Sequence, residues 1–537
     1  MFLNQSIQLK PLEKGVFLII VLVHFALAMS FHLSPDEAHY ALYANHLDWS
    51  YYDHPPMVGW VQWLMSQVSE TDLVMRLVPM FCWVLSAYLS MVLYQKFQVK
   101  YAVQNDASAE NLLDKLPKIR SILILWITSP LLNLLSIALV PDCLLMTLVA
   151  ALMLLTWEMA NSKNVPTIQQ WVGLGILLGF CGLSKYTAIF FAMSAAGVLF
   201  KVHGLKLVRE KGFWLALGIA FVMITPVLYW NFKHEWISFI YQFGHASGSQ
   251  TWQLHKSIIY SLVLFFAFGP LLIIGLVFNK QVKNPNSVLK TFTKQPNRTE
   301  FPEKLDTASL TDSMFSWIFA LPTFLILVIL AGRGSALPHW IAPAWVALIP
   351  LAALGLDRWR PLKKKWWMGV LSFQVASCMA MAGLLLTAGF GGEVEESSIS
   401  LAGEKPVSAK PNPFADLIGW DQAAKKAVEL AVLNHVDTLA VMNWTLASRI
   451  AWYARPMAVK VIQSHHDQFD LWFGPMHPDD DVIWVDWSLM TFDPPVEDQQ
   501  FESCEQLEQM PIKRMGRQVA HFNFLLCKNW QRNNLSR

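Results

Sequence analysis

Long apolar runs decide what this chain can fold into, because about 20 mostly apolar residues in a row can cross a lipid bilayer as a helix. Eleven such runs, a few of them short, lie within the first 390 residues. They cover residues 15–31, 73–95, 119–139, 143–160, 170–183, 186–202, 213–230, 256–278, 312–331, 341–357 and 366–389. The pattern predicts an α-helical polytopic membrane protein with about 11 transmembrane helices.

The scarcity of charge agrees with this fold class. Charged residues make up 15% of the chain, against about 25% in soluble proteins. This excludes a typical cytosolic enzyme, a disordered chain and a coiled coil. The formal net charge of +2 argues against a nucleic-acid partner held by bulk charge. The first run could instead be a secretory signal peptide, but the later runs make a multi-pass protein in either case.

The distribution of Lys and Arg tests the orientation of the chain in the membrane and whether one long apolar stretch forms one helix or two. Residues 170–202 form one apolar stretch broken at Ser184-Lys185-Tyr186, and a single kinked helix there would reverse the side of every later segment. With two helices and a cytoplasmic N-terminus, the inner segments hold 23 Lys and Arg and the outer segments hold 4. Cytoplasmic loops are enriched in these residues. We therefore expect two helices, a cytoplasmic N-terminus and a flexible cytoplasmic loop at 281–311.

Residues 391–537, called the tail below, differ from the membrane domain of residues 1–390. The tail holds 13 Lys and Arg and 20 Asp and Glu, and it follows an odd number of spans, so we expect it outside the cytoplasm. Its patterns predict helices at 421–433 and 445–454 and strands at 438–441, 459–462, 482–487 and 519–526. These alternating elements predict a small α/β domain. A disulfide between Cys504 and Cys527 is expected if the compartment is oxidising.

The first outer loop, residues 31–72, carries six acids and four histidines but no Lys or Arg. Its half-apolar stretches predict helices that lie in the membrane interface. Ser34, Pro35 and Glu37 have the spacing of a helix start closed by a capping box. That arrangement accounts for Glu37 but does not require Asp36. A carboxylate at the outer end of a span is a candidate general base toward a hydroxyl group.

Other charges are expected at the same membrane face. Asp142 follows Pro141 at one outer turn, and Lys185 lies at the next. Charges in membrane segments mark either function or a buried pair, and a structural Asp142–Lys185 salt bridge is the plainer alternative. Arg333 and His339 lie in another outer turn. A site for an anionic lipid head group would need cations that bind its phosphate and a carboxylate that takes part in the chemistry. The residues at this face include both kinds of group.

These segments resemble a known family. The ordered motifs, most of them at the outer ends of spans, are similar to those of the family 39 glycosyltransferases, the protein O-mannosyltransferase-like enzymes related to the lipid A aminoarabinose transferase. They are Asp36-Glu37-Ala38-His39-Tyr40, Trp49-Ser50-Tyr51-Tyr52-Asp53-His54-Pro55-Pro56, Pro141-Asp142, Gly182-Leu183-Ser184-Lys185-Tyr186-Thr187, Trp230-Asn231, His234-Glu235-Trp236-Ile237-Ser238-Phe239 and Pro338-His339-Trp340. The resemblance covers most of residues 15–390 and, more weakly, the tail.

The resemblance implies a GT-C fold and an inverting transfer of a hexosyl or pentosyl group from a polyprenyl-phosphate donor to an acceptor outside the cytoplasm. It implies that the chain lies in the plasma membrane, the inner membrane of a bacterium. The acceptor class stays open between lipid, glycan and protein. Some relatives bind a metal near the first outer loop, but four scattered histidines do not specify a site. We therefore expect no cofactor, with a divalent metal as the alternative.

The family's roles carry over to matching residues. Asp36 is the expected catalytic carboxylate, with Glu37 beside it and Asp142 in support. The donor phosphate and substrate are expected at six residues: Asp53, His54, Lys185, Tyr186, Arg333 and His339. His54 replaces a lysine of the aminoarabinose branch, which puts a full positive charge there in doubt. The competing functions are a transporter or flippase of a polyprenyl-linked or anionic lipid, and a scaffold whose tail recruits partners.

Overall fold

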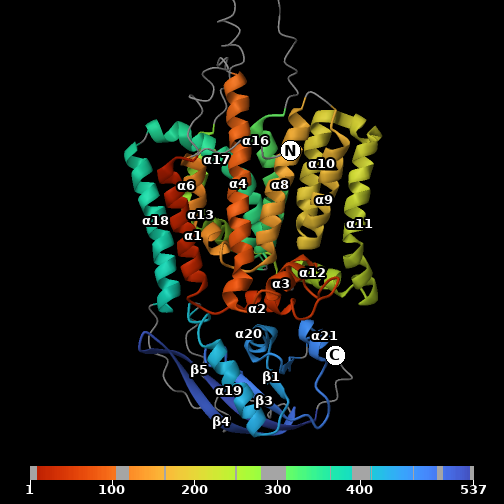
Figure 1. Ribbon diagram of the computed structural model, residues 1–537, viewed down its shortest axis with the longest axis vertical. Coiled ribbons are helices and arrows are strands. Elements are labelled where there is room, and N and C mark those ends of the chain that lie inside the picture. The colour runs from red at the N-terminus through yellow and green to blue at the C-terminus, as the bar shows by residue number, and fades with distance from the viewer. Residues whose placement is uncertain are drawn as a thin grey trace, which may run out of the picture.

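The computed structural model describes residues 9–104, 120–162, 165–247, 251–279, 310–334, 336–362, 364–389, 412, 414–463, 465–492 and 500–531. A bundle of helices stands on a smaller sheet domain formed by the tail (Figure 1). The expected loop at 281–311 lies almost entirely outside the described residues, as does the boundary at 390 and 391. Both therefore stay predictions.

The bundle consists of apolar helices. They are α1 (Pro11–Ala28), α4 (Asp72–Gln104), α6 (Arg120–Thr128), α7 (Pro130–Leu135), α8 (Pro141–Asn161), α9 (Ile168–Ser184), α10 (Ala188–His203), α11 (Lys211–Lys233), α13 (Leu254–Phe268), α14 (Pro270–Phe278), α16 (Asp312–Ala331), α17 (Ala342–Leu362) and α18 (Lys364–Thr387), with the 3-10 helices η2 (Gly204–Arg209) and η3 (Pro338–Ile341). Within the described part of the chain, eight helical segments are each long and apolar enough to cross a bilayer. The chain is a multi-pass membrane protein, and the count of 11 spans stays a prediction.

Two of the expected spans are broken rather than continuous. Pro130 separates α6 from α7, and α13 meets α14 at an angle of 94° at Gly269 and Pro270. Proline cannot donate to the helix ladder, and Gly269 has a positive φ of 93° that suits glycine. Side chains pair the backbone groups released there: the Asn133 amide donates to two carbonyls of the α6–α7 break, and Gln374 Oε1 accepts an N–H of α14 at 3.2 Å.

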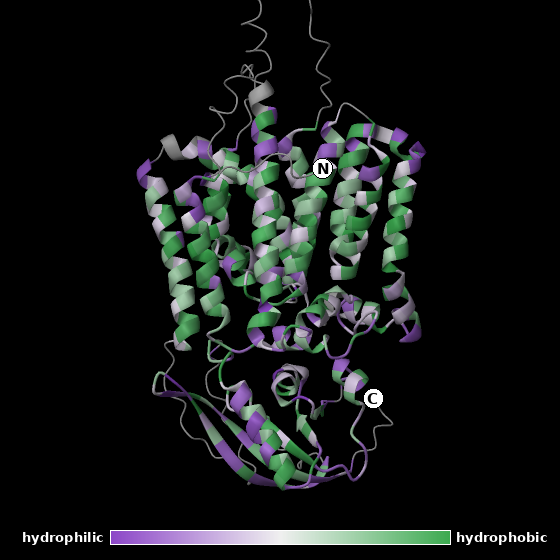
Figure 2. Cartoon of the chain, in the orientation of Figure 1, coloured by the Kyte–Doolittle hydropathy of each residue, from purple (hydrophilic) through white to green (hydrophobic). Residues whose placement is uncertain are grey.

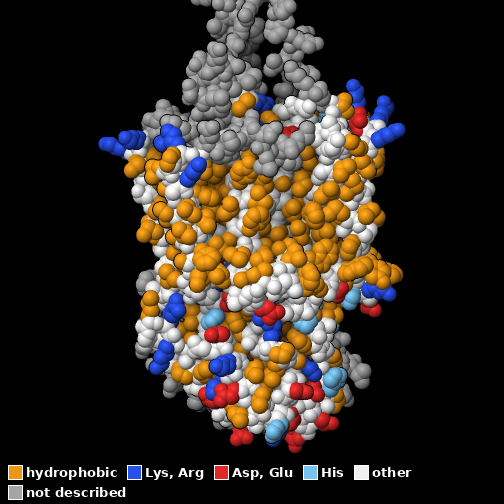
Figure 3. Space-filling view, in the orientation of Figure 1, with side chains coloured by type: hydrophobic (Ala, Val, Ile, Leu, Met, Phe, Trp, Pro, Cys, Tyr) orange, Lys and Arg blue, Asp and Glu red, His pale blue; other side chains and the backbone are white. Residues whose placement is uncertain are grey.

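The ambiguous stretch at 170–202 forms two helices, as expected. α9 ends at Lys185, whose backbone is extended, and α10 runs beside α9 (Figure 1). Green, apolar segments dominate the bundle in Figure 2, and the apolar surface forms a belt around it in Figure 3. Lys and Arg gather at the end of this belt farthest from the tail (Figure 3). The side of the membrane on which each terminus lies stays a prediction.

Three helices lie across the end of the bundle that faces the tail (Figure 1). They are α2 (Pro35–Leu42) and α3 (Met57–Ser66) in the first outer loop, and α12 (Ile237–Ser247). The interfacial helices expected in the first outer loop are thus present, and they form the layer between the bundle and the tail.

The tail is an α/β domain, as expected. Its elements are α19 (Trp420–Leu433), β1 (Thr438–Val441), α20 (Trp444–Ala454), β2 (Ala458–Val461), α21 (Gln468–Phe473), β3 (Val482–Trp487), β4 (Phe501–Arg514) and β5 (Arg517–Trp530). The strand order is β2-β1-β3-β5-β4. β1 pairs in parallel with β2 and β3, whereas β5 is antiparallel to β3 and β4. β4 was not expected, because this edge strand is partly exposed and rich in charge, as edge strands often are.

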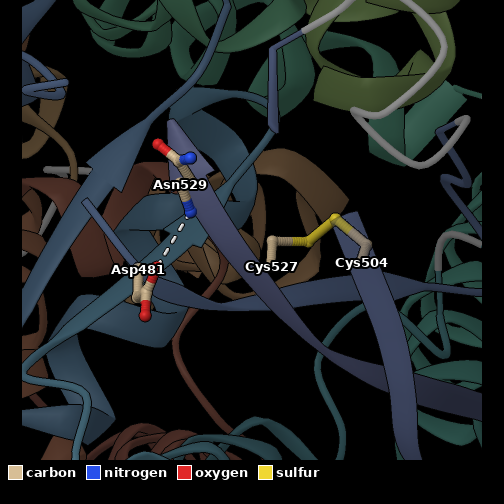
Figure 4. The surroundings of a disulfide bond; sticks show 4 residues. All are labelled: Asp481, Cys504, Cys527 and Asn529. Carbon is tan, nitrogen blue, oxygen red and sulfur yellow. Dashed lines mark hydrogen bonds between the residues drawn. A yellow bond between two sulfur atoms is a disulfide. The ribbon is translucent and has the colours of Figure 1, made fainter. Parts of the chain in front are cut away.

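The disulfide between Cys504 and Cys527 is formed in the structure (Figure 4). The two cysteines lie directly opposite each other on β4 and β5. Close by, the backbone N–H of Asn529 donates to Asp481 Oδ1 at 2.8 Å (Figure 4). The covalent link therefore fastens the edge strand to the centre of the sheet.

Candidate active site

Glu37 is held by structural partners on every side. The expected capping box is present: Ser34 Oγ accepts the N–H of Glu37, and Glu37 Oε2 accepts the N–H of Ser34 at 3.0 Å. The Arg76 guanidinium, fully buried on α4, donates to both carboxylate oxygens at 2.8 and 2.9 Å. Leu139 N donates to Oε1 at 3.1 Å. Burial alone would raise the pKa of Glu37, but Arg76 and these hydrogen bonds lower it. Glu37 thus anchors α2 to the bundle.

Asp36, one residue earlier, has a different environment. No hydrogen bond to its carboxylate is found among the residues that the structure describes. Burial raises the pKa of Asp36 to about 6, and the nearby charges of Asp53 and Glu37 add to this while those of His39 and Lys185 oppose it. A carboxyl group with a pKa near the working pH, and without a structural partner, is suited to exchange protons with a ligand.

Asp53 and His54 are close to α2. The Tyr43 hydroxyl donates to Asp53 Oδ1 at 2.5 Å, and the imidazole nitrogens Nε2 of His39 and His54 are 3.5 and 3.9 Å from its oxygens. Burial favours a raised pKa for Asp53, but both histidines and these hydrogen bonds lower it well below its usual range. Burial also lowers the pKa of His54 to about 4. A pKa of about 4 favours the neutral form of His54 near pH 7, in line with the doubt about a full positive charge at this position.

Lys185 and Asp142 form a buried ion pair. Lys185 Nζ donates to both oxygens of Asp142 at 2.7 and 2.6 Å, and their side chains are 6% and 1% exposed. His339 Nε2 lies 3.8 Å from the same carboxylate, and the ammonium lies 5.5 Å from the ring centroid of Trp340. The salt bridge considered as the plainer alternative exists. It places Lys185 within electrostatic range of Asp36 and His54.

The two remaining site residues are placed differently. The Tyr186 hydroxyl is 3.4 Å from Ser50 Oγ, which ties the α9–α10 turn to the first outer loop. Arg333 lies in the turn that follows α16. The charges that act most strongly on Asp36 are those of His39, Asp53, Glu37 and Lys185, so Arg333 is not among them.

The tail contributes contacts that sequence reasoning missed. Gln468 Oε1 accepts the N–H of Tyr52 at 2.7 Å. Asp72, where α4 begins, accepts hydrogen bonds from Trp452 Nε1 at 2.9 Å and from the Tyr453 hydroxyl at 2.6 Å. No periodicity or spacing links these positions, which are about 400 residues apart in the chain. The weak resemblance of the tail to the family, at 443–454 and 470–472, was the available signal.

Across the described ranges, no group of three or more His, Cys, Asp or Glu side chains is arranged to hold a metal ion. The residues that meet here supply carboxylates, one paired ammonium and several imidazoles. Lys185, Asp142 and His339 meet where α9 ends, where α8 begins and within η3.

Comparisons with known proteins agree with this picture. Residues 53–230 match the family model described as dolichyl-phosphate-mannose-protein mannosyltransferase. The chain is 22% identical over 315 residues to the lipid A galacturonosyltransferase RgtD of Rhizobium johnstonii, covering 58% of this chain and 58% of that relative. The chain thus spans less than two thirds of the length of this curated relative.

Two crystal structures share the overall fold. They are ArnT from Cupriavidus metallidurans in the apo state, at 13% identity and a TM-score of 0.54, and the same protein bound to undecaprenyl phosphate, at 14% identity and a TM-score of 0.56. Each match covers 96% of this chain and 98% of ArnT. The apolar helices and the shared fold therefore define a polytopic membrane protein with a fold of the GT-C type. Within that class, the resemblance to the family 39 glycosyltransferases is confirmed.

Proposed function

We propose that this protein is a membrane glycosyltransferase that moves a sugar from a polyprenyl-phosphate donor to an acceptor at the outer face of the bilayer. One observation carries the proposal. Asp36, a half-buried carboxylate without a structural hydrogen bond among the described residues, lies within electrostatic range of Lys185, which pairs with Asp142. A base beside a cation at the boundary between lipid and water fits a lipid phosphate that must leave as an anion. ArnT bound to undecaprenyl phosphate has the same fold.

The chemistry is a single displacement with inversion. The Asp36 carboxylate accepts the proton of an acceptor hydroxyl, and the acceptor oxygen forms a bond to the anomeric carbon. The bond from that carbon to the phosphate oxygen breaks, and its electron pair leaves with polyprenyl phosphate. Because this leaving group is a stable anion, no strong general acid is required. Lys185 stabilises the charge that develops on the phosphate in a site of low dielectric.

The other residues of the site have supporting roles in this proposal. Asp142 orients the Lys185 ammonium, and Tyr186 and His339 line the phosphate side of the site. Glu37 holds α2 so that Asp36 points at the acceptor, which makes Glu37 a positioning residue. Asp53 and His54 contact the sugar. Arg333 contacts the phosphate only when a bound donor reaches the turn in which Arg333 lies. The reaction needs no cofactor or metal, so chelators are expected to leave the rate unchanged.

The substrate class and topology belong to the same proposal. The transferred group is a hexosyl or pentosyl unit, and the acceptor is a lipid, a glycan or a protein. The N-terminus faces the cytoplasm of a bacterial inner membrane, and the tail lies outside it. The excess of Lys and Arg in the inner segments supports this orientation.

Purified protein in liposomes tests the function directly. Liposomes receive defined polyprenyl-phosphate sugars and envelope lipids, and mass spectrometry follows the donor. Consumption of the donor with formation of a glycosylated acceptor supports the transferase. Movement of intact donor between leaflets without transfer would instead support the flippase. Protein-free liposomes control for hydrolysis.

A further inference from the structure

The hairpin formed by β4 and β5 contacts the membrane domain through its tip, residues 513–517. Arg514 donates to the carbonyl of Leu386 in the last turn of α18 at 3.1 Å and to that of Ser30, just past α1, at 3.4 Å. Arg517 donates to two more carbonyls at or just after the end of α18, at 3.5 and 3.3 Å. The last carbonyls of a helix have no partner within it, and cations are favoured there. The hairpin tip is therefore fixed at the ends of α1 and α18 that face the tail (Figure 1).

These two helix ends place the hairpin tip at the surface of the bilayer. Little of the apolar stretch of α1 or α18 is buried within the protein, so lipid covers most of both helices. Met29, directly before Ser30, is 63% exposed. With 24 residues, α18 is about 36 Å long, slightly more than the hydrocarbon core of about 30 Å. The end of α18 that Arg514 and Arg517 contact thus lies at the depth of the lipid head groups.

The turn of this hairpin carries an unusual residue. Arg514 pairs with Arg517, so Met515 and Gly516 form a two-residue turn, with φ of 49° and 79°. Turns with a positive φ at both positions favour Asn, Asp and Gly, because other side chains are strained there. Met515 is nevertheless 70% exposed, more than any other large apolar side chain in the described part of the tail. Neither the backbone nor contact with water accounts for a methionine at this position, whereas contact with lipid would.

Charge is distributed in the same sense. The tail is acidic, with 13 Lys and Arg against 20 Asp and Glu, yet three of the 13 basic residues lie within residues 513–517, which contain no acid. Lys513 is exposed, and its ammonium group makes no hydrogen bond or ion pair with the residues that the structure describes. Basic side chains beside an exposed apolar one are typical of segments that bind the surface of an anionic membrane.

We propose that the hairpin tip is a membrane-binding surface whose partner is a bilayer that contains anionic phospholipid. Met515 enters the head-group layer, and the Lys513 ammonium binds lipid phosphate, while the arginines hold the tip against α1 and α18. The tail then has an attachment to the bilayer itself, in addition to its contacts with the first outer loop. This inference does not depend on the proposed sugar transfer.

An environment-sensitive fluorescent label on Met515→Cys tests the inference without an activity assay. The full chain is placed in nanodiscs of phosphatidylcholine, with or without phosphatidylglycerol. Leu433→Cys is the matched control, because Leu433 is 66% exposed and ends α19, which runs from its contact with His32 away from the bundle (Figure 1). The unaltered protein, treated with the same label, gives the background from the four free cysteines.

The label at position 515 is expected to emit at shorter wavelength than the label at position 433 and to be quenched by spin-labelled lipids. Both effects are expected to be larger with phosphatidylglycerol and to weaken at high salt. Adding Lys513→Gln is expected to remove most of the difference between the two bilayers. Both substituted side chains are exposed, so the variants are expected to fold.

Two results would overturn the inference. The first is emission at position 515 that equals the control in both bilayers, since the hairpin tip would then be in water. The second is a signal that is the same in neutral and anionic bilayers, or that Lys513→Gln leaves unchanged, since lipid phosphate would then have no part in the contact.

Discussion

Separate and joint removal of the Lys185 and Asp142 charges distinguishes the structural role of this pair from its chemical role. In Asp142→Asn, the Lys185 ammonium stays buried without its carboxylate, whose oxygens are 2.7 and 2.6 Å away in the unaltered protein. Breaking a buried pair on one side costs about 3–5 kcal/mol, while replacing both partners with neutral groups is often close to neutral. Each single variant, Asp142→Asn or Lys185→Met, is therefore expected to lose about 3–5 kcal/mol, and the double variant to regain most of it.

Thermal unfolding in detergent gives the stability, and transfer from a polyprenyl-phosphate donor gives the function. The double variant is expected to be close to the unaltered protein in stability and inactive in transfer, because no ammonium remains for the leaving phosphate. If the double variant is as unstable as the single variants, the energetic reasoning is wrong. If it is stable and transfers sugar at a normal rate, the role assigned to Lys185 is wrong.

Three further outcomes are expected. Transfer is expected to fall as the pH drops through about 6, because Asp36, with its raised pKa, must lose its proton before it can act as a base; a flat rate down to pH 5 would contradict this. Glu37→Gln is expected to lower stability by about 3–5 kcal/mol, because the buried charge of Arg76 loses its carboxylate and keeps only backbone carbonyls. Adding Arg76→Met is expected to restore part of this stability in thermal unfolding. Replacing Cys504 and Cys527 with serine is expected to lower the stability of the folded tail by about 2–4 kcal/mol. Limited proteolysis is then expected to cut the tail faster than in the unaltered protein, while the bundle stays intact.

Much of the fold could be predicted because apolar runs and the positions of Lys and Arg are local properties of the sequence. They separated α9 from α10 at Lys185, where a propensity argument alone would allow one long helix. The breaks at Pro130 and Gly269 were less accessible. Whether such a residue kinks a span or splits it depends on side-chain partners. Asn133 lies on α7 close to its break, whereas Gln374 comes from α18, far along the chain.

The parts of the site that depend on motifs between residues close in the sequence could be predicted. The spacing of Ser34 and Glu37 predicts a capping box, and Asp36 is the acidic residue which that motif does not use. Arg76 was missed as the partner of Glu37, because it lies within an apolar run 39 residues away. The tail was missed for a similar reason: contacts between residues about 400 positions apart leave no periodic trace in a single sequence.

The most direct test of the account compares Asp36→Asn with a matched control, Glu158→Gln. Glu158 pairs with Lys96 at 2.9 Å near the opposite end of α8 from Asp142, so the control also removes one carboxylate, far from the site. Single-turnover transfer is measured with purified protein, together with binding of the polyprenyl-phosphate donor. We predict that Asp36→Asn binds the donor and loses at least about a hundredfold in rate, while Glu158→Gln transfers normally. Transfer by Asp36→Asn at the rate of the unaltered protein would contradict the central claim.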